Sequence, residues 1–383
     1  MGHERCMRAR AMPHTRYTLL ALLTVASRRC GASVPCDPNA TSEARDLLQM
    51  LHDLQTSGRT LSGQLESDEH DDAAGGSKTF TARDWRRVFN ITGRHPALWG
   101  SQFLWGSPDW AAPYRQQMVD QAVALWESPA GRVVTALNFH LCPPTEAFLS
   151  RRCHWSDIEG DDMGKRRPDL VPAVLREGTV ENRIWLADLD MMASFLKQLA
   201  QKNVPVLWRP FHEANGAWFW WGGQPPHLHT ALWAQMHARF STVHGLHNLI
   251  WVYGASSQFD VAPYYPGEAL VDVCGQDLYA ISQNRSGFTD ALYADVVRVS
   301  AGKKVIAWTE IGLAPGRAVL ASQPHAFLMT WGGFEVLGND TKKNRKKDSP
   351  DELRALYDNS QVLKQGDLRP WALRRDAKGQ GPK

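Results

Sequence analysis

Short apolar segments alternate with segments of helical periodicity along most of this chain, and this alternation limits the fold more than any other feature. From about residue 41, for example, Leu47, Leu48, Leu51 and Leu54 share one face of a predicted helix that stops near Gly58. Each helical segment is followed by a short strand-like one. Eight strands are predicted, over residues 60–64, 97–101, 133–140, 204–213, 249–254, 271–279, 304–310 and 327–332.

Eight alternating strands and helices predict a closed parallel barrel. Parallel strands need crossover connections, which are usually helices, and eight such strands close a sheet on itself. We therefore predict the α/β class and a (β/α)8 TIM barrel over residues 36–366. An open, doubly wound sheet is the alternative, but its first strand is commonly followed by a Gly-x-Gly-x-x-Gly turn, which this chain lacks.

The two ends of the chain differ from the rest. Basic residues up to Arg16 precede an apolar stretch of about ten residues, and small residues follow near Ser33, which is the layout of a secretory signal. A bilayer crossing takes about 20 apolar residues. We therefore expect residues 1–33 to be a signal peptide and the protein to be secreted to the extracellular space as a monomer, without a membrane anchor. Residues 367–383 have the composition of a disordered tail.

Functional side chains are concentrated in residues 205–222. A buried strand delivers Arg209, His212 and Glu213 to its C-terminal end, where barrel enzymes keep their active sites. Flat apolar rings match the C–H faces of sugars, and they remove water from a neighbouring carboxyl group, which raises its pKa. Glu213 is therefore the first candidate for a general acid in a sugar-binding cleft. The aromatic side chains that surround it are Phe211, Trp218, Trp220 and Trp221.

A second carboxylate is needed if the site cleaves glycosidic bonds. One acid protonates the leaving oxygen, and the other attacks the sugar or activates water. Glu310 closes the seventh predicted strand, so the barrel brings it to the same rim as Glu213. Asp277 and Glu66 are the other acids that this reasoning allows. The strand count makes Glu310 the preferred partner.

These motifs resemble one known family. Residues 209–222 and 308–312, which read RPFHEANGAWFWWG and WTEIG, are similar to glycoside hydrolase family 26, the secreted β-mannanases. The resemblance extends over about residues 62–357. Related barrel families carry Asn immediately before the acid/base, whereas this chain has His212, as family 26 does. Other matching segments are residues 137–140, 248–253 and 275–279.

The resemblance implies roles for individual residues. It implies that Glu213 is the acid/base and Glu310 the nucleophile of a retaining reaction, and that Tyr279 hydrogen-bonds the nucleophile and holds it ionised. One departure from the family follows Tyr253, where residues 254–257 replace an expected Ser-Pro-Asp-like turn, and we expect it to alter outer subsites. The residues implied to bind the sugar at the cleavage point are His140, Arg209, His212, Trp218, Asp277 and Tyr279.

Several of these residues also have structural interpretations. Arg209 is expected to neutralise buried acids rather than to contact substrate directly. The packing alternative for His212 is a buried histidine, but its place beside the acid favours contact with a sugar hydroxyl. Trp218 is the tryptophan chosen for the site. Because Trp220 and Trp221 are adjacent and point in different directions, we expect one of them to belong to the core.

The segment of residues 140–188 after the third strand is predicted to form a wall of the cleft. It contains Cys142 and Cys153, and in an oxidising compartment a disulfide between them would fix this loop. Trp155, next to this pair, and Trp331, at the end of the eighth strand, are further candidates for sugar platforms. Core packing is the alternative for each.

No metal, cofactor or nucleic acid is predicted as a partner. His212 and Glu213 are followed by Asn215 and Gly216, so the zinc-binding pattern His-Glu-x-x-His is absent. The formal net charge of +3 is too small to indicate nucleic acid. The basic run of residues 342–347 is most simply a solvated surface.

The predicted activity is hydrolysis of β-mannan by an endo-β-1,4-mannanase. A β-1,3-1,4-glucanase or a β-1,3-xylanase on the same scaffold is the alternative within the enzymes, because the central motif does not by itself encode recognition of the axial 2-hydroxyl of mannose. A non-catalytic mannan-binding protein is the alternative outside them. The presence of both Glu213 and Glu310 argues against that alternative.

Overall fold

A computed structural model describes residues 33–66, 82–106, 108–150, 153–279, 287–332 and 349–368. Three segments discussed above lie outside the described residues: the expected signal peptide up to residue 32, the basic run 342–347 and the tail from residue 369. The side chain of Trp155 also lies outside them, so its expected role as a sugar platform stays a prediction.

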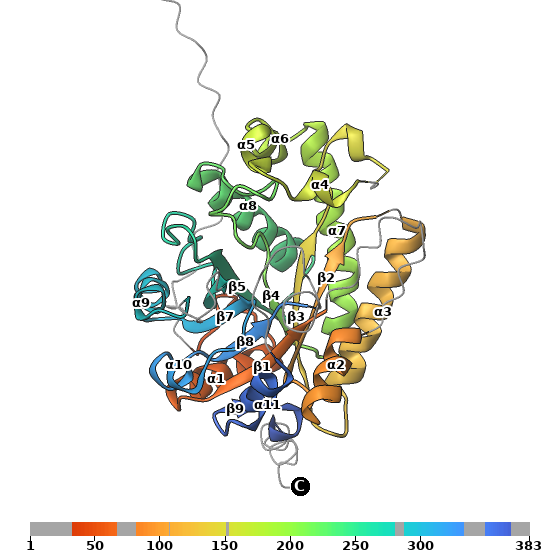
Figure 1. Ribbon diagram of the computed structural model, residues 1–383. Coiled ribbons are helices and arrows are strands. Elements are labelled where there is room, and N and C mark those ends of the chain that lie inside the picture. Colours follow the sequence, from red (N-terminus) through yellow and green to blue (C-terminus); the bar gives the residue numbers. More distant parts are fainter. Residues whose placement is uncertain are drawn as a thin grey trace, which may run out of the picture.

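Eight parallel strands form a closed barrel, which confirms the predicted (β/α)8 fold (Figure 1). Each strand pairs with the next one along the chain, and β1 pairs with both β2 and β8. Nearly all strand residues are buried, because the barrel interior covers one face and helices cover the other. The strands are β1 (Thr60–Leu65), β2 (Leu98–Leu104), β3 (Val134–His140), β4 (Val206–Trp208), β5 (Leu249–Ser256), β6 (Val273–Leu278), β7 (Val305–Ile311) and β8 (Phe327–Thr330).

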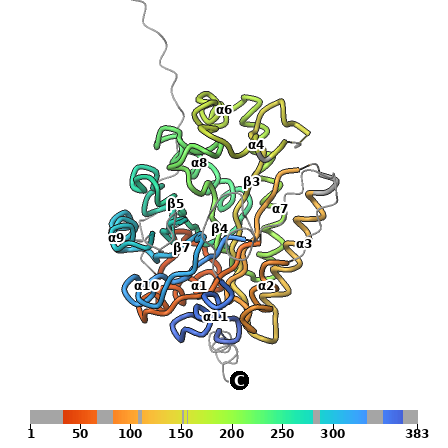
Figure 2. The backbone as a smooth tube through the Cα atoms, in the orientation of Figure 1, coloured from red at the N-terminus to blue at the C-terminus, as the bar shows by residue number. Residues whose placement is uncertain are grey.

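Helices surround the barrel (Figure 2). They include α1 (Ser42–Thr56), α2 (Arg83–Thr92), α3 (Pro108–Trp126), α7 (Val180–Gln201), α8 (Pro226–Ala238), α9 (Asp290–Val299), α10 (Arg317–Ser322) and α11 (Pro350–Asp358). Two shorter turns are η2 (Arg239–Val243) and η3 (Gln365–Leu368). Side chains fix several helix starts: the Thr41 hydroxyl accepts from the Ala44 amide, and the Thr179 hydroxyl from the Asn182 amide. The predicted leucine face of α1 is buried in the same cluster as inward-facing strand residues.

The fourth strand is shorter than predicted. It ends at Trp208 because Pro210 has no amide hydrogen for the ladder and the chain then turns. Phe211 has a φ of 48° and Glu213 a φ of 54°, both in the left-handed region. A short ninth strand, β9 (Val362–Leu363), pairs in parallel with the start of β1. It was not predicted, because two residues carry no periodic signal.

The long connection after β3 folds over the loop that follows β4. It contains η1 (Glu146–Phe148), α4 (Trp155–Ile158), α5 (Met163–Arg166) and α6 (Leu170–Leu175), of which the last three lie together at the top of Figure 1. The Gly160 amide donates to the Trp218 carbonyl at 2.8 Å, and the Gly164 amide to the Ala217 carbonyl at 3.0 Å. A β-carbon on Gly164 would lie 1.8 Å from the Gly222 carbonyl oxygen, so this close approach requires glycine.

A disulfide joins Cys142 to Cys153, the pair singled out from the sequence, with Cα atoms 5.9 Å apart. Cys142 comes two residues after the end of β3, so the bridge ties the connection to a barrel strand. Cys274, in β6, is a buried free thiol. Together, the disulfide and the glycine contacts hold the connection against the chain that carries Trp218.

Candidate active site

Glu213 stands in the turn that ends β4, with its backbone in the left-handed region. This conformation costs a non-glycine residue about 1–3 kcal/mol and persists only where neighbouring contacts hold it. Here the Glu213 amide donates to the Gly254 carbonyl at 2.9 Å. The Trp218 indole N–H donates to Oε2 of the carboxyl group at 2.7 Å, and only 9% of Glu213 is exposed. These contacts fix the carboxyl group in one orientation at the end of the barrel.

Asn215 fastens this turn to the end of β5. Its amide nitrogen donates to the Ser256 carbonyl at 2.8 Å, and its amide oxygen accepts from the Ser256 amide at 2.9 Å. Both residues are buried. The turn that carries Glu213 and the end of the neighbouring strand therefore form one unit.

Glu310 reaches the same region from β7 through a β-bulge. Trp308 pairs with Gln276 of β6, but the next pair is Glu310 with Asp277, so β7 contains one extra residue, Thr309. Neighbouring residues of a regular strand point to opposite faces, and a bulge removes this restriction locally. Thr309 Oγ1 consequently donates to Oδ1 of Asp277 at 2.6 Å, while Glu310 binds other groups of the same site.

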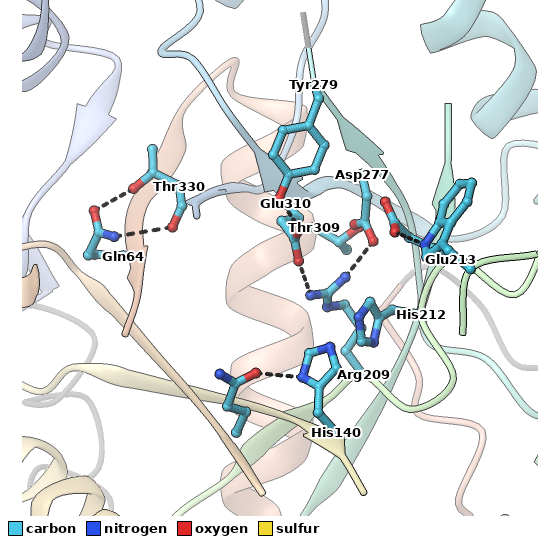
Figure 3. Close-up of polar contacts among 12 residues, drawn as sticks. Gln64, His140, Arg209, His212, Glu213, Asp277, Tyr279, Thr309, Glu310 and Thr330 are labelled. Carbon is cyan, nitrogen blue, oxygen red and sulfur yellow. Dashed lines mark hydrogen bonds and ion pairs between the residues drawn. The ribbon is translucent and has the colours of Figure 1, made fainter. Parts of the chain in front are cut away.

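Arg209 links two carboxylates at the centre of the site (Figure 3). Its guanidinium donates to Oδ2 of Asp277 and to Oε2 of Glu310, both at 2.5 Å. The Tyr279 hydroxyl donates to the other oxygen of Glu310. Burial by itself would lower the pKa of Arg209, but the two carboxylates outweigh burial and raise it. The charged hydrogen bonds of this cluster stabilise a negative charge on Glu310.

The surroundings of Glu213 favour its protonated form. Burial raises the pKa of Glu213 well above its ordinary range, and the charges of Asp277 and Glu310 raise it further. The hydrogen bond from Trp218 and the charge of Arg209 oppose this rise without cancelling it. Burial also raises the pKa of Asp277, to about 7, against the opposing charge of Arg209, whereas Glu213 has no bond to the guanidinium.

Two histidines lie beside the guanidinium. His140 Nδ1 is 2.6 Å from Oε1 of Gln102, and the rings of His140 and His212 meet edge to face with centroids 4.7 Å apart. Burial lowers the pKa of His212 well below its usual value, and the charges of Arg209 and His140 lower it further. His212 is therefore neutral. Among the described residues its buried Nδ1 has no hydrogen-bond partner.

Trp331 follows β8 and is partly exposed at the same end of the barrel. Its ring centroid lies 6.5 Å from that of His140, and its carbonyl accepts from the Gln64 side chain at 3.2 Å. Gln64 is held in turn by Thr330, whose hydroxyl donates to Gln64 Oε1 at 2.7 Å (Figure 3). This position suits the predicted stacking role of Trp331.

Four sequence expectations need correction or refinement. The Asp277 side chain has 0% exposure and binds Arg209, so the structure gives it a positioning role, and its expected contact with the sugar stays a prediction. Arg209 is likewise occupied by carboxylates, in keeping with a positioning role. The Glu66 carboxylate accepts backbone amides at the start of α2, which makes it a helix cap rather than a catalytic partner. Both Trp220 and Trp221 are fully buried, where one was expected to be.

The sequence reasoning missed the residues that make room for this cluster. A β-carbon on Gly275 would lie 2.3 Å from the Thr309 side chain, and one on Gly254 would lie 3.0 Å from both Arg209 Cδ and Thr309 Oγ1. The two glycines sit in neighbouring strands. Glycine inside a strand is the signal that could have found them, because it often marks a close approach of other groups.

The described ranges show neither a metal-binding cluster nor a membrane-spanning helix. They contain no group of three or more His, Cys, Asp or Glu side chains arranged to hold a metal ion. No helix of the described chain combines the length and the apolar character that a membrane crossing needs.

Comparison with known proteins identifies the family. The model of glycosyl hydrolase family 26 matches residues 36–367. The chain belongs to this family. The resemblance drawn from the motifs is thereby confirmed, and the pair of glutamates can be considered as the site of a glycoside hydrolase.

Characterised relatives are similar over most of the chain. A mannan endo-1,4-beta-mannosidase from Thermothelomyces thermophilus is 29% identical over 342 residues, which cover 88% of this chain and 67% of the relative. A mannan endo-1,4-beta-mannosidase from Bacillus subtilis is 29% identical over 295 residues, with 73% of each chain covered. Against two Piromyces enzymes the match spans less than half of the relative, 42% and 45%.

Solved structures of the family superpose on the barrel. A β-mannanase from a symbiotic protist of the termite Reticulitermes speratus, complexed with gluco-manno-oligosaccharide, has a TM-score of 0.72 at 27% identity and covers 88% of this chain and 98% of that one. GH26A from a Muricauda species has a TM-score of 0.71 at 28% identity, with 87% and 99% covered.

Proposed function

We propose that this family 26 protein is a secreted, retaining endo-β-1,4-mannanase in which Glu213 is the acid/base and Glu310 the nucleophile. The observation that carries the proposal is the contrast between two carboxyl groups at one end of the barrel. Glu213 is buried with its pKa raised well above the ordinary range, whereas Glu310 accepts hydrogen bonds from Arg209 and Tyr279. Relatives named mannan endo-1,4-beta-mannosidase support mannan as the substrate.

The proposed reaction has two steps. In the first, Glu310 attacks the anomeric carbon, and Glu213 gives its proton to the glycosidic oxygen of the departing chain. A covalent bond forms between Glu310 and the sugar as the glycosidic bond breaks. In the second step, Glu213, now ionised, removes a proton from water, which displaces Glu310 and restores both groups. The anomeric configuration is retained because two inversions follow one another.

The other side chains have supporting roles in this mechanism. Arg209 and Tyr279 hydrogen-bond the carboxyl group of Glu310 and orient it toward the anomeric carbon. Neutral His212 is the histidine proposed to bind a sugar hydroxyl, and it adds no charge that would compete with Arg209 for the carboxylates. The ring of His140 packs edge to face against it. Trp331 supplies an aromatic surface near His140.

The substrate is tested by hydrolysis of a panel of polysaccharides. Release of reducing sugar from galactomannan, glucomannan, barley glucan and xylan separates the mannanase from a β-1,3-1,4-glucanase or a β-1,3-xylanase. We expect cleavage of both mannans with oligosaccharide products of mixed length, as internal attack requires. Activity on barley glucan with none on mannans contradicts the proposal, and absence of any hydrolysis leaves a mannan-binding protein.

Stereochemistry and secretion need separate measurements. Proton NMR of the first product from mannohexaose should show the β-anomer before mutarotation, and a first-formed α-anomer contradicts retention. Secretion rests on residues 1–33 alone. We expect the enzyme in the culture medium to begin near residue 34, which N-terminal sequencing checks.

A further inference from the structure

The loop after β5 carries an exposed aromatic residue beside the proposed acid/base. Phe259 is 50% exposed, and its ring centroid lies 5.8 Å from that of Trp218 at an interplanar angle of 40°. Trp218 in turn donates its indole N–H to Glu213. A chain of contacts therefore leads from the proposed acid/base through one aromatic ring to a second that faces solvent.

The position of Phe259 is built into the site rather than incidental to a surface loop. Asn215, two residues after Glu213, donates to the carbonyls of Ser256 at 2.8 Å and of Phe259 at 3.3 Å. Beyond the tip, the hydroxyl of Tyr253 holds the returning chain by donating to the Val261 carbonyl at 2.7 Å. The loop is thus anchored on both sides of Phe259, and its ring is carried at a set distance from the turn of the acid/base.

This loop also follows directly on residues 254–257, where the sequence departs from the turn expected for the family. In the proposed reaction Glu213 lies next to the glycosidic oxygen that leaves, so the rings that continue from Glu213 lie close to the departing sugars. The sugar attacked by Glu310 lies on the other side of that oxygen. The flat face of a β-1,4-linked mannosyl unit presents C–H groups that stack on such rings.

We propose that Phe259, together with Trp218, binds the first sugars of the leaving half of the mannan chain. This inference rests on the proposed function and adds to it a residue that determines how well long leaving groups are used. The occupant is a β-1,4-mannosyl segment, chosen because the surface begins at the indole that binds the proposed proton donor. A substrate whose leaving group is too small to reach Phe259 should be cleaved equally well with or without this ring.

The test compares two substrates that differ in the leaving group. Mannohexaose leaves a sugar chain on the Glu213 side, whereas β-mannobiosyl fluoride leaves a single fluoride ion. For Phe259→Ala we expect the ratio of kcat/KM on mannohexaose to that on the fluoride to fall about tenfold, as suits the loss of one aromatic contact. Phe259→Tyr, which keeps the ring, should stay within about twofold of the wild-type ratio.

A matched control is Phe89→Ala, because Phe89 is an exposed phenylalanine of similar exposure, 42%, on helix α2. In Phe89→Ala the ratio of kcat/KM on mannohexaose to that on the fluoride should equal that of the wild type. Circular dichroism checks that all variants fold. An unchanged ratio in Phe259→Ala, or equal losses on both substrates, overturns the inference. A wild-type enzyme that cleaves neither mannan nor mannohexaose contradicts the proposed function instead, so the two failures are distinct.

Discussion

The turn after β4 and the bulge in β7 deliver the same functional group, a glutamate, into opposite surroundings. Glu213 is buried, and its closest polar partner is the neutral indole of Trp218. Glu310 is bound by a guanidinium and a phenol hydroxyl. Because a charged donor favours a carboxylate more than a neutral one does, these surroundings support the proposed roles of Glu213 as proton donor and Glu310 as nucleophile.

Each of these surroundings depends on a local irregularity of the backbone. The left-handed residues of the β4 turn present Glu213 beside its tryptophan, and the extra residue of β7 allows both Thr309 and Glu310 to bind polar groups of the site. A regular strand could not do this, since adjacent side chains would point to opposite faces. The proposed roles of the two acids therefore depend on backbone geometry as much as on side-chain identity.

The largest effect is expected when the anionic member of the pair is removed. Glu310→Ala should lower kcat on mannan by at least about 10⁴-fold, because no group remains to form the covalent intermediate. With an activated aryl β-mannobioside, added azide should restore turnover and give the α-glycosyl azide, identified by NMR. The control is Glu66→Gln, which weakens the cap of α2 but should leave kcat near that of the wild type. A kcat loss in the Glu66 variant comparable to that of the Glu310 variant contradicts the assignment.

Removal of the protonated member should have a smaller effect that depends on the substrate. Glu213→Ala should lower kcat/KM on mannan by about 10²–10⁴-fold, because the leaving oxygen is no longer protonated. On aryl glycosides whose leaving group needs no proton, the loss in the first step should be much smaller. Azide should here give the β-glycosyl azide, by reaction with the glycosyl-enzyme. Equal losses on both kinds of substrate would show that Glu213 is not the acid.

Arg209→Met tests the shared cation. Removing it leaves Asp277 and Glu310 buried without a positive partner, which should lower the free energy of unfolding by about 3–5 kcal/mol at neutral pH. Burial already raises the pKa of Asp277 to about 7 against the opposing charge of Arg209, and without that charge it rises further, so part of the lost stability returns as the pH falls and Asp277 takes up a proton. Urea unfolding at pH 5 and pH 8 measures this. Arg209→Lys keeps the charge and should lose less free energy of unfolding than Arg209→Met. If Arg209→Met loses the same free energy of unfolding at pH 5 and pH 8, the ion-pair account is wrong.

The sequence predicted the parts of this arrangement that follow from regular patterns. Alternation of helices and strands predicted the barrel, and the positions of Glu213 and Glu310 at strand ends predicted that they share one rim. Those arguments rely only on periodicity and on the direction of parallel strands. The pairing of Cys142 with Cys153 could be proposed because both lie in one polar loop.

The remaining features depend on geometry that a pattern does not contain. The bulge at Thr309 cannot be predicted from the sequence, because one extra residue does not change the mainly apolar character of the strand. The burial of Asp277 could not be distinguished from a position on the site surface, because both place a carboxylate at the end of β6. Trp220 and Trp221 both enter the core because the chain there turns continuously, so the alternation expected of a strand does not apply.

The smallest expected effect tests how finely Trp218 adjusts the protonated acid. Its N–H bond is one of the interactions that lower the pKa of Glu213, so Trp218→Phe, which keeps an aromatic ring and removes the donor, should raise that pKa further. The reaction needs the protonated acid, so the alkaline limb of the pH profile of kcat/KM on mannan should move to higher pH. Trp331→Phe is the control, because it changes a tryptophan that has no bond to Glu213. The alkaline limb of its pH profile should stay where it is in the wild type. If the alkaline limb of the pH profile moves to lower pH in Trp218→Phe, the indole stabilises the protonated carboxyl group. The difference between the two glutamates then has another cause.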